Sequence, residues 1–311
     1  MSVDTDSSVF STGSQTLNEF TVERDGHGRI WRFVQLPLTR IVIATTSLIA
    51  AILLLTAVAT VTHFKPTFLP IVLGAVLLTS AALIGTYVLY VRLIERRVAT
   101  ELGTQGAGSE FAVGFMLGGV LFCLIMLILW LAGVAVIGEG AGWAALWVAL
   151  FGALELGVLQ AIFVCGILFR IVEGSLGTWI ALALTVIAFG AAHAGSQGAS
   201  LVSVSVIGLE AGTLLVAMYV YSRRLWMLMG LLAAWNFVED GVFGVSVPGH
   251  EEKGLLVSHF HGPQILTGGP AGPEVTIVAL LVSLLVAIII FQRAIRKDHI
   301  IKPFWRRPAV H

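Results

Sequence analysis

The chain has 311 residues, of which 57% are apolar and only 12% are charged, and its mean hydropathy is +0.95. A water-soluble domain carries about twice that share of charged residues, so lipid must form part of the solvent of this protein. The formal net charge is zero, which gives no reason to expect a nucleic-acid partner. The composition therefore predicts an all-α, polytopic transmembrane helix bundle whose first partner is the lipid bilayer.

The chain begins with polar residues that contain no basic stretch followed by an apolar one, so they do not resemble a signal peptide. We expect residues 1–33 to form a disordered cytoplasmic tail. Residues 34–142 then hold three predicted spans, residues 143–292 hold five more, and residues 293–311 form a basic cytoplasmic tail. The eight apolar runs, each about as long as a membrane-spanning helix, are Ile41–Val61, Phe68–Val91, Phe111–Ile137, Trp143–Phe169, Leu176–Ala194, Ser200–Tyr221, Leu225–Val242 and Val275–Phe291.

The basic residues test this count. With the N-terminus inside, sixteen of the eighteen Lys and Arg residues fall on the cytoplasmic side, and the two exceptions are Lys65 and Lys253. Cytoplasmic loops of membrane proteins are enriched in Lys and Arg. We therefore predict a multi-pass plasma-membrane protein with eight spans and both termini in the cytoplasm.

Few polar side chains lie within the spans, and ionisable ones at membrane depth are functional candidates by default. They are Glu155 in the fourth span, His193 at the end of the fifth and Glu210 in the sixth; Gln160 and Asn236 are neutral but polar. A structural interpretation competes for each. The two glutamates could be protonated and hydrogen-bonded to neighbouring helices, and His193 could be a packed or solvated residue near the interface.

Two Gly-x-x-x-Gly pairs, Gly114 with Gly118 and Gly208 with Gly212, predict close helix packing. Their spacing does not tell whether the partner helix belongs to the same chain. Glu210 lies between the second pair, so a closely packed helix would keep water from its carboxylate and suit it to proton transfer.

The outer end of the seventh span and the loop after it are also polar. Glu239 and Asp240 lie close enough to the outer surface to reach water. The loop, residues 243–274, is rich in Gly and Pro and contains three histidines, for which we favour a solvated loop over a metal site.

The second half of the chain resembles a known family. The similar stretches are VCGILFRIVEGSLGTWIALALTVIAFGAAHAGSQGAS at Val164–Ser200, LEAGTLLVAMYVYSRRLW at Leu209–Trp226, AAWNFVEDGVFG at Ala233–Gly244 and LTGGPAGPE at Leu266–Glu274. They resemble the core of the CPBP family, the CAAX-protease and bacteriocin-processing membrane proteins, over roughly residues 143–291. The resemblance implies an intramembrane endopeptidase, in which a glutamate activates water while histidines and an asparagine bind metal or stabilise the oxyanion. It also implies a membrane-protein partner or a prenylated or hydrophobic peptide.

Three motifs carry the chemistry of that family, and this chain keeps part of them. The second, Phe-x-x-x-His, is intact and ends at His193, which the resemblance makes a metal ligand for a divalent ion such as zinc. The third, His-x-x-x-Asn, keeps Asn236 but has Leu232 in place of its histidine. The first, Glu-Glu-x-x-x-Arg, is replaced throughout, and its three polar positions are occupied by Gln160, Ala161 and Cys165.

These replacements leave three hypotheses open. A glutamine cannot take a proton from water, and one His with one Asn cannot supply the usual three protein ligands of zinc. The first hypothesis is therefore a pseudoenzyme of the family that binds a membrane partner or a lipidated or hydrophobic peptide. The second is an active protease with a rearranged centre of His193, Asn236 and Glu210. The third is a proton-coupled transporter that uses Glu155 and Glu210.

Overall fold

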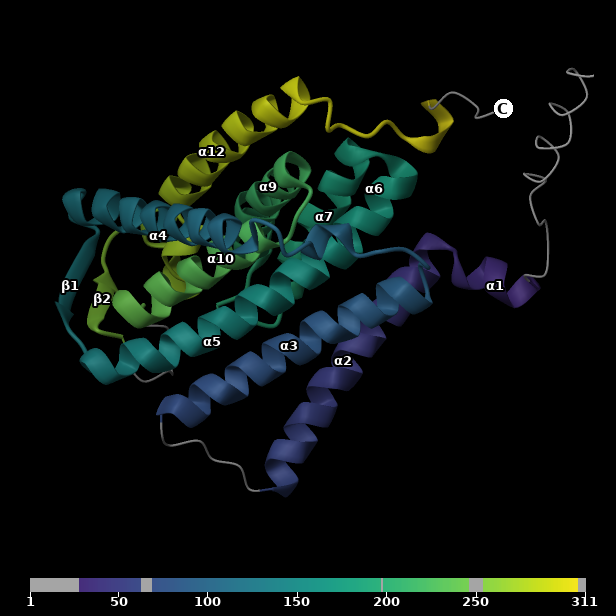
Figure 1. Ribbon diagram of the computed structural model, residues 1–311. Helices are drawn as coiled ribbons and strands as arrows, with labels where there is room; N and C mark the ends of the chain where they lie inside the picture. The colour runs from purple at the N-terminus through teal and green to yellow at the C-terminus, as the bar shows by residue number, and fades with distance from the viewer. Residues whose placement is uncertain (1–27, 63–68, 197, 246–253, 307–311) are drawn as a thin grey trace, which may run out of the picture.

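The computed structural model describes residues 28–62, 69–196, 198–245 and 254–306, and in this part of the chain the protein is a bundle of helices (Figure 1). Six helical stretches among these residues are long and apolar enough to cross a membrane, as the composition predicts for a multi-pass membrane protein. Four of them are single helices, α2 (Pro37–Val61), α3 (Leu69–Leu93), α4 (Ala107–Leu131) and α12 (Ile277–Arg296). In the fifth, α5 (Trp143–Ala161) continues through the π-helical segment Ile162–Phe169 into α6 (Arg170–Leu176). In the sixth, α8 (Leu201–Ile207) continues through the π-helical segment Gly208–Gly212 into α9 (Thr213–Ser222).

The fifth and seventh predicted spans form shorter helices. Helix α7 (Thr178–Ala192) has 15 residues, about 22 Å at the rise of an α-helix, and a bilayer core is about 30 Å thick. Helix α10 (Trp226–Asn236) is extended by the π-helical segment Phe237–Val242. The number of eight crossings stays a prediction.

The third predicted span is wrong at its outer end. Helix α4 stops at Leu131, because Gly133 adopts a positive φ of 71° and its N–H turns back to the carbonyl of Trp130. The residues that follow form strand β1 (Ala135–Glu139), which pairs antiparallel with β2 (Leu256–Phe260) of the loop 243–274. The two strands lie at the end of the bundle opposite α1 (Arg29–Val34) (Figure 1).

The remaining elements are short and lie in the connections and tails. Residues 1–27 of the predicted N-terminal tail lie outside the described residues, and α1 forms directly after them. After α12, the backbone of Ile301 exchanges two hydrogen bonds of 2.9 Å with Thr178, so part of the basic C-terminal segment is bound to the start of α7. The other short elements are α11 (Gln264–Thr267) and the 3₁₀ turns Thr100–Leu102, Gly269–Ala271, Pro273–Val275 and Phe304–Arg306.

Glycines let α10 pack backbone to backbone against its neighbours within this chain. A methyl group at Gly118 of α4 would collide with the carbonyl oxygen of Leu231 in α10, and Gly114 faces Met227 in the same way. The second Gly-x-x-x-Gly pair also packs internally, since Gly208 lies against α7. Both pairs are therefore used inside the monomer.

The end of the bundle near α1 is held by buried charges. The side chain of Glu95 is 1% exposed and forms ion pairs with Arg40, Arg97 and Arg170, the last two at 2.7 Å. Arg97 also pairs with Glu101, which accepts a hydrogen bond from the hydroxyl of a tyrosine in α3. Burial by itself would raise the pKa of Glu95, but the guanidinium groups of Arg170 and Arg40 lower it to about 2.

We expect Gly118→Ala to destabilise the protein, because the new methyl group must push α10 away. Overpacking of this kind costs about 1–3 kcal/mol, whereas Ala is otherwise the better helix former by up to about 1 kcal/mol. Gly152→Ala in α5 is the control, because no atom lies within 4 Å of the position that its new methyl group would take. Thermal unfolding in detergent should show a lower Tm for Gly118→Ala and an equal or higher Tm for Gly152→Ala. Equal Tm values for the two variants would contradict the backbone contact.

We expect Glu95→Gln to destabilise the protein by about 1–3 kcal/mol, because it removes the buried charge that pairs with three partly exposed arginines. A carboxyl with a lowered pKa contributes stability above its ordinary pKa of about 4.5, and this stability is lost as the pH falls toward 2. Unfolding measured from pH 7 to pH 3 should therefore be less pH-dependent in the variant. Glu139→Gln, at an exposed glutamate of β1, should change stability by less than about 0.5 kcal/mol. An effect of Glu95→Gln no larger than that of Glu139→Gln would show that the buried ion pairs contribute little.

Candidate functional site

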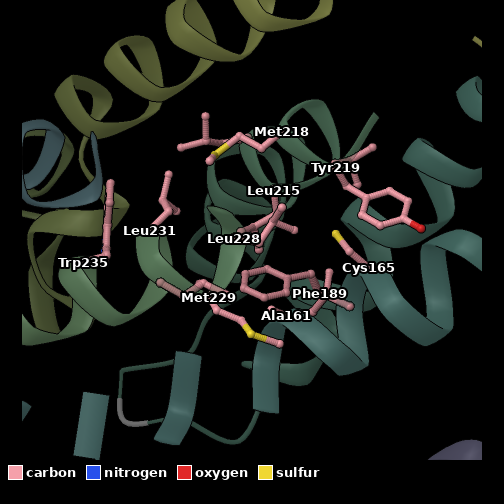
Figure 2. Close-up of a cluster of buried hydrophobic side chains, with 14 of the residues drawn as sticks. Ala161, Cys165, Phe189, Leu215, Met218, Tyr219, Leu228, Met229, Leu231 and Trp235 are labelled. Carbon is pink, nitrogen blue, oxygen red and sulfur yellow. The ribbon is translucent and has the colours of Figure 1, made fainter. Parts of the chain in front are cut away.

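A cavity of about 270 Å³ lies inside the bundle, between α5, α7, α10, α12 and the helical stretch Leu201–Ser222. Part of the lining is apolar and is here called the apolar wall; Phe189, Leu215, Leu231 and Trp235 of this lining appear among the buried side chains of Figure 2. The other side chains of interest are polar. They are Gln160, His193, Glu210, Asn236, Glu239, Asp240, Glu274 and Ser283.

The four residues that the sequence singles out as a site all line this cavity. Gln160 comes from α5, His193 directly follows α7, Glu210 lies between α8 and α9, and Asn236 ends α10. They are far apart in the chain and come from four different helices. Glu155, by contrast, does not line the cavity, although it lies on the same helix as Gln160.

Each of three cavity helices contains a π-helical segment next to its site residue. One begins just after Gln160, the second contains Glu210, and the third begins just after Asn236. A π-helical turn holds an extra residue, so it redirects the side chains beside it and is frequent at functional sites. In the first segment the carbonyl oxygen of Gly166 accepts hydrogen bonds from Arg170 at 2.7 Å and from Tyr87 at 3.0 Å. This contact ties the wall of the cavity to the buried charges at the end of the bundle.

The histidine is oriented by its own helix. Nδ1 of His193 lies 2.9 Å from the carbonyl oxygen of Phe189, one turn earlier, and the two rings are in contact with their centroids 4.9 Å apart. A carbonyl oxygen accepts hydrogen bonds and cannot donate them, so Nδ1 carries the proton in this contact. Nε2 of the neutral ring then has a free lone pair, which can accept a proton or a hydrogen bond.

The two amides of the site differ in how their oxygen atoms are placed. Nδ2 of Asn236 donates to the carbonyl of Leu232 at 2.8 Å, which leaves its Oδ1 as the end of the amide that can accept from a ligand. Oε1 of Gln160 is buried and has no hydrogen-bond partner. A buried acceptor without a partner is unfavourable unless a bound molecule or water satisfies it.

The carboxylates were only partly foreseen. Glu210 is 1% exposed and accepts a hydrogen bond of 3.1 Å from Ser283 of α12. Glu239 and Asp240 also line this cavity, and Asp240 is exposed, so the expectation that they reach water is not contradicted. Glu274 joins them from the loop 243–274, where burial, with a contribution from the charge of Asp240, raises its pKa. Glu274 ends the family-like stretch LTGGPAGPE, but nothing in that stretch indicates a place in the cavity, which depends on how the loop folds against the bundle.

The cavity does not fit a zinc ion as its residues stand. Across the described ranges, no three His, Cys, Asp or Glu side chains lie close enough together to hold a metal. The position of the missing motif histidine is filled by Leu232, which is 5% exposed and lines the cavity. His193 is thus the sole nitrogen ligand that the described lining residues offer to zinc.

Comparison of the chain with protein-family models, with curated proteins and with solved structures found no match in any of the three.

Proposed function

We propose that this membrane protein is related to the CPBP endopeptidases and that its cavity binds a hydrophobic or lipidated peptide segment without cutting it by the family's route. One observation carries the proposal. Gln160, His193 and Asn236, one position from each of the three family motifs, line a single cavity although three separate helices supply them. If the sequence resemblance were accidental, there would be no reason for these three positions to meet at one cavity.

The composition of the cavity wall suits such a ligand. Phe189, Leu215 and Trp235 line the cavity with apolar side chains, and the same helices also supply polar side chains to its lining. Ligand sites are typically apolar pockets with a few convergent polar groups that fix orientation. A peptide segment with apolar side chains matches this arrangement, because its backbone can meet the polar groups while its side chains meet the wall.

The family's route to hydrolysis requires groups that these positions do not supply. A glutamine at 160 cannot act as a general base. Ala161 and Cys165, at the other two positions of the first motif, are both fully buried, so neither brings a polar group to the cavity. Leu232 replaces a histidine with an apolar side chain. Binding without cleavage is the function that this set of side chains supports best.

A second candidate function, hydrolysis by a rearranged centre, rests on the carboxylates. Glu210 and Glu239 line the same cavity as His193, so a base and a proton carrier are present in one place. In such a centre Nε2 of His193 or one carboxylate would take the proton of the attacking water. Glu155 does not line this cavity, so it takes no part in such a centre.

Restoring two motif positions tests whether this protein is related to the CPBP endopeptidases. Gln160→Glu with Leu232→His returns a base and a second histidine to positions that line the cavity, whereas Ala161→Glu would force a charge into the core. Purified protein in liposomes is mixed with hydrophobic and prenylated peptides, and products are read by mass spectrometry. We expect wild type to retain peptide without detectable products, and the double variant to yield products at least about a hundredfold above the wild-type background. Adding His193→Ala should abolish that cleavage.

The same assay separates the alternatives. Cleavage by wild type that is lost in both His193→Ala and Glu210→Gln would establish the rearranged centre instead. If wild type retains no peptide and the folded double variant does not cut, the proposed function is contradicted.

A further inference from the structure

The charges around the cavity all have one sign. Four carboxyl side chains line it, those of Glu210, Glu239, Asp240 and Glu274, and no Lys or Arg is among the described residues that do. Among the described residues, partly buried arginines lie elsewhere, in the ion pairs of Glu95 and of Glu173. Glu210 is buried, Glu239 and Glu274 are half-buried and Asp240 is exposed. A buried carboxylate without a counter-ion destabilises a structure, and a positively charged ligand beside Glu210, Glu239 and Glu274 would offset this cost.

The neutral polar groups of the cavity point to the same ligand chemistry. Oε1 of Gln160 is buried without a hydrogen-bond partner. Nε2 of His193 is also an acceptor, because Nδ1 donates to a backbone carbonyl, and Oδ1 of Asn236 is an acceptor beside an Nδ2 that donates one of its two N–H groups to the carbonyl of Leu232. The hydroxyl of Ser283 already donates to Glu210. A ligand that satisfies this set must bring several N–H or O–H donors.

A bare metal ion would supply positive charge, but it has no N–H or O–H donors for the acceptors of the cavity. In the part of the chain that is described, no three carboxylate, thiol or imidazole side chains are close enough to coordinate one ion. The acceptors instead surround a space of about 270 Å³, which is much larger than a bare ion and is lined in part by the apolar wall. A cationic nitrogen group on an apolar body fits this space, since its N–H donors can reach separated acceptors while its carbon atoms meet the wall.

We infer that the cavity selects a ligand that carries an alkylammonium or guanidinium group, such as a Lys or Arg side chain within a hydrophobic segment. This inference rests on the proposed function and specifies its substrate class. The acceptors and carboxylates bind the cationic group, and the apolar wall binds the remainder of the segment. A hydrophobic peptide and a free alkylamine both offer this chemistry, and the experiment distinguishes them.

The test uses the full chain in nanodiscs of phosphatidylcholine and phosphatidylglycerol, which carry no primary amine. Three fluorescent hydrophobic peptides differ at one central position, which is Lys, norleucine or Glu, and binding is read by anisotropy. We expect the Lys peptide to bind about tenfold or more tightly than the norleucine peptide, as for a charge-assisted contact, and the Glu peptide to bind most weakly. Glu239→Gln and Glu274→Gln should each reduce the ratio of Lys to norleucine affinity.

Glu155→Gln is the matched control, because Glu155 lies on a cavity helix but does not line the cavity. It should leave the ratio unchanged. Thermal unfolding verifies that each variant is folded, and the two cavity variants replace one another if either fails this check. Dodecylamine, Mg²⁺ and Ca²⁺ are added as competitors to identify the source of the cation.

The outcomes separate the inference from the function on which it rests. Equal binding of all three peptides would overturn the inference and leave peptide binding intact. Binding of dodecylamine without any peptide, lost in Glu239→Gln, would support the cation preference and contradict peptide binding. Displacement of the Lys peptide by Mg²⁺ or Ca²⁺, but not by dodecylamine, would make a divalent ion the ligand and overturn the inference. Binding of none of these probes would overturn both.

Discussion

The position of α10 between its neighbours is the constraint on which the site depends. Gly114 and Gly118 of α4 allow its backbone to approach on one side, and Gly157 of α5 allows it on the other. Lipid gives little hydrophobic drive for helices to associate, so close van der Waals contact of this kind must supply much of the packing energy. Because α10 is held on both sides, Asn236 and the glutamate one turn later are directed into the cavity instead of toward lipid.

Three π-helical turns determine which side chains of the packed helices face the cavity. Regular helices would present side chains at fixed intervals of 100°, and a π-helical turn changes that interval locally. The turns beside Gln160, Glu210 and Asn236 therefore adjust which side chains face inward. The carbonyl that the first turn exposes is held by Tyr87 and Arg170, so the ionic cluster at one end of the bundle also fixes part of the cavity wall. The fold and the site thus share the same buried polar contacts.

The sequence predicts what depends on local composition and misses what depends on contacts between distant segments. The helices α2, α3 and α12 begin within a few residues of their predicted starts, because a lipid-exposed helix must be an uninterrupted apolar run. The strand after α4 was missed, because Val136 and Ile137 continue that run and only the pairing with β2 distinguishes strand from helix. The motif positions suggested Gln160, His193 and Asn236 as one site, whereas Glu274 reaches it through a loop whose path no local pattern specifies.

The most direct test of peptide binding in the cavity is photo-cross-linking of wild-type protein. A hydrophobic peptide with one diazirine-bearing leucine is irradiated with the protein in nanodiscs, and the labelled residues are identified by mass spectrometry. The account predicts labels on cavity-lining segments of two or more helices, such as 207–215 and 231–240, and their loss when unlabelled peptide competes. Labels confined to the lipid-exposed faces of α2 and α3, or insensitive to competition, would contradict it.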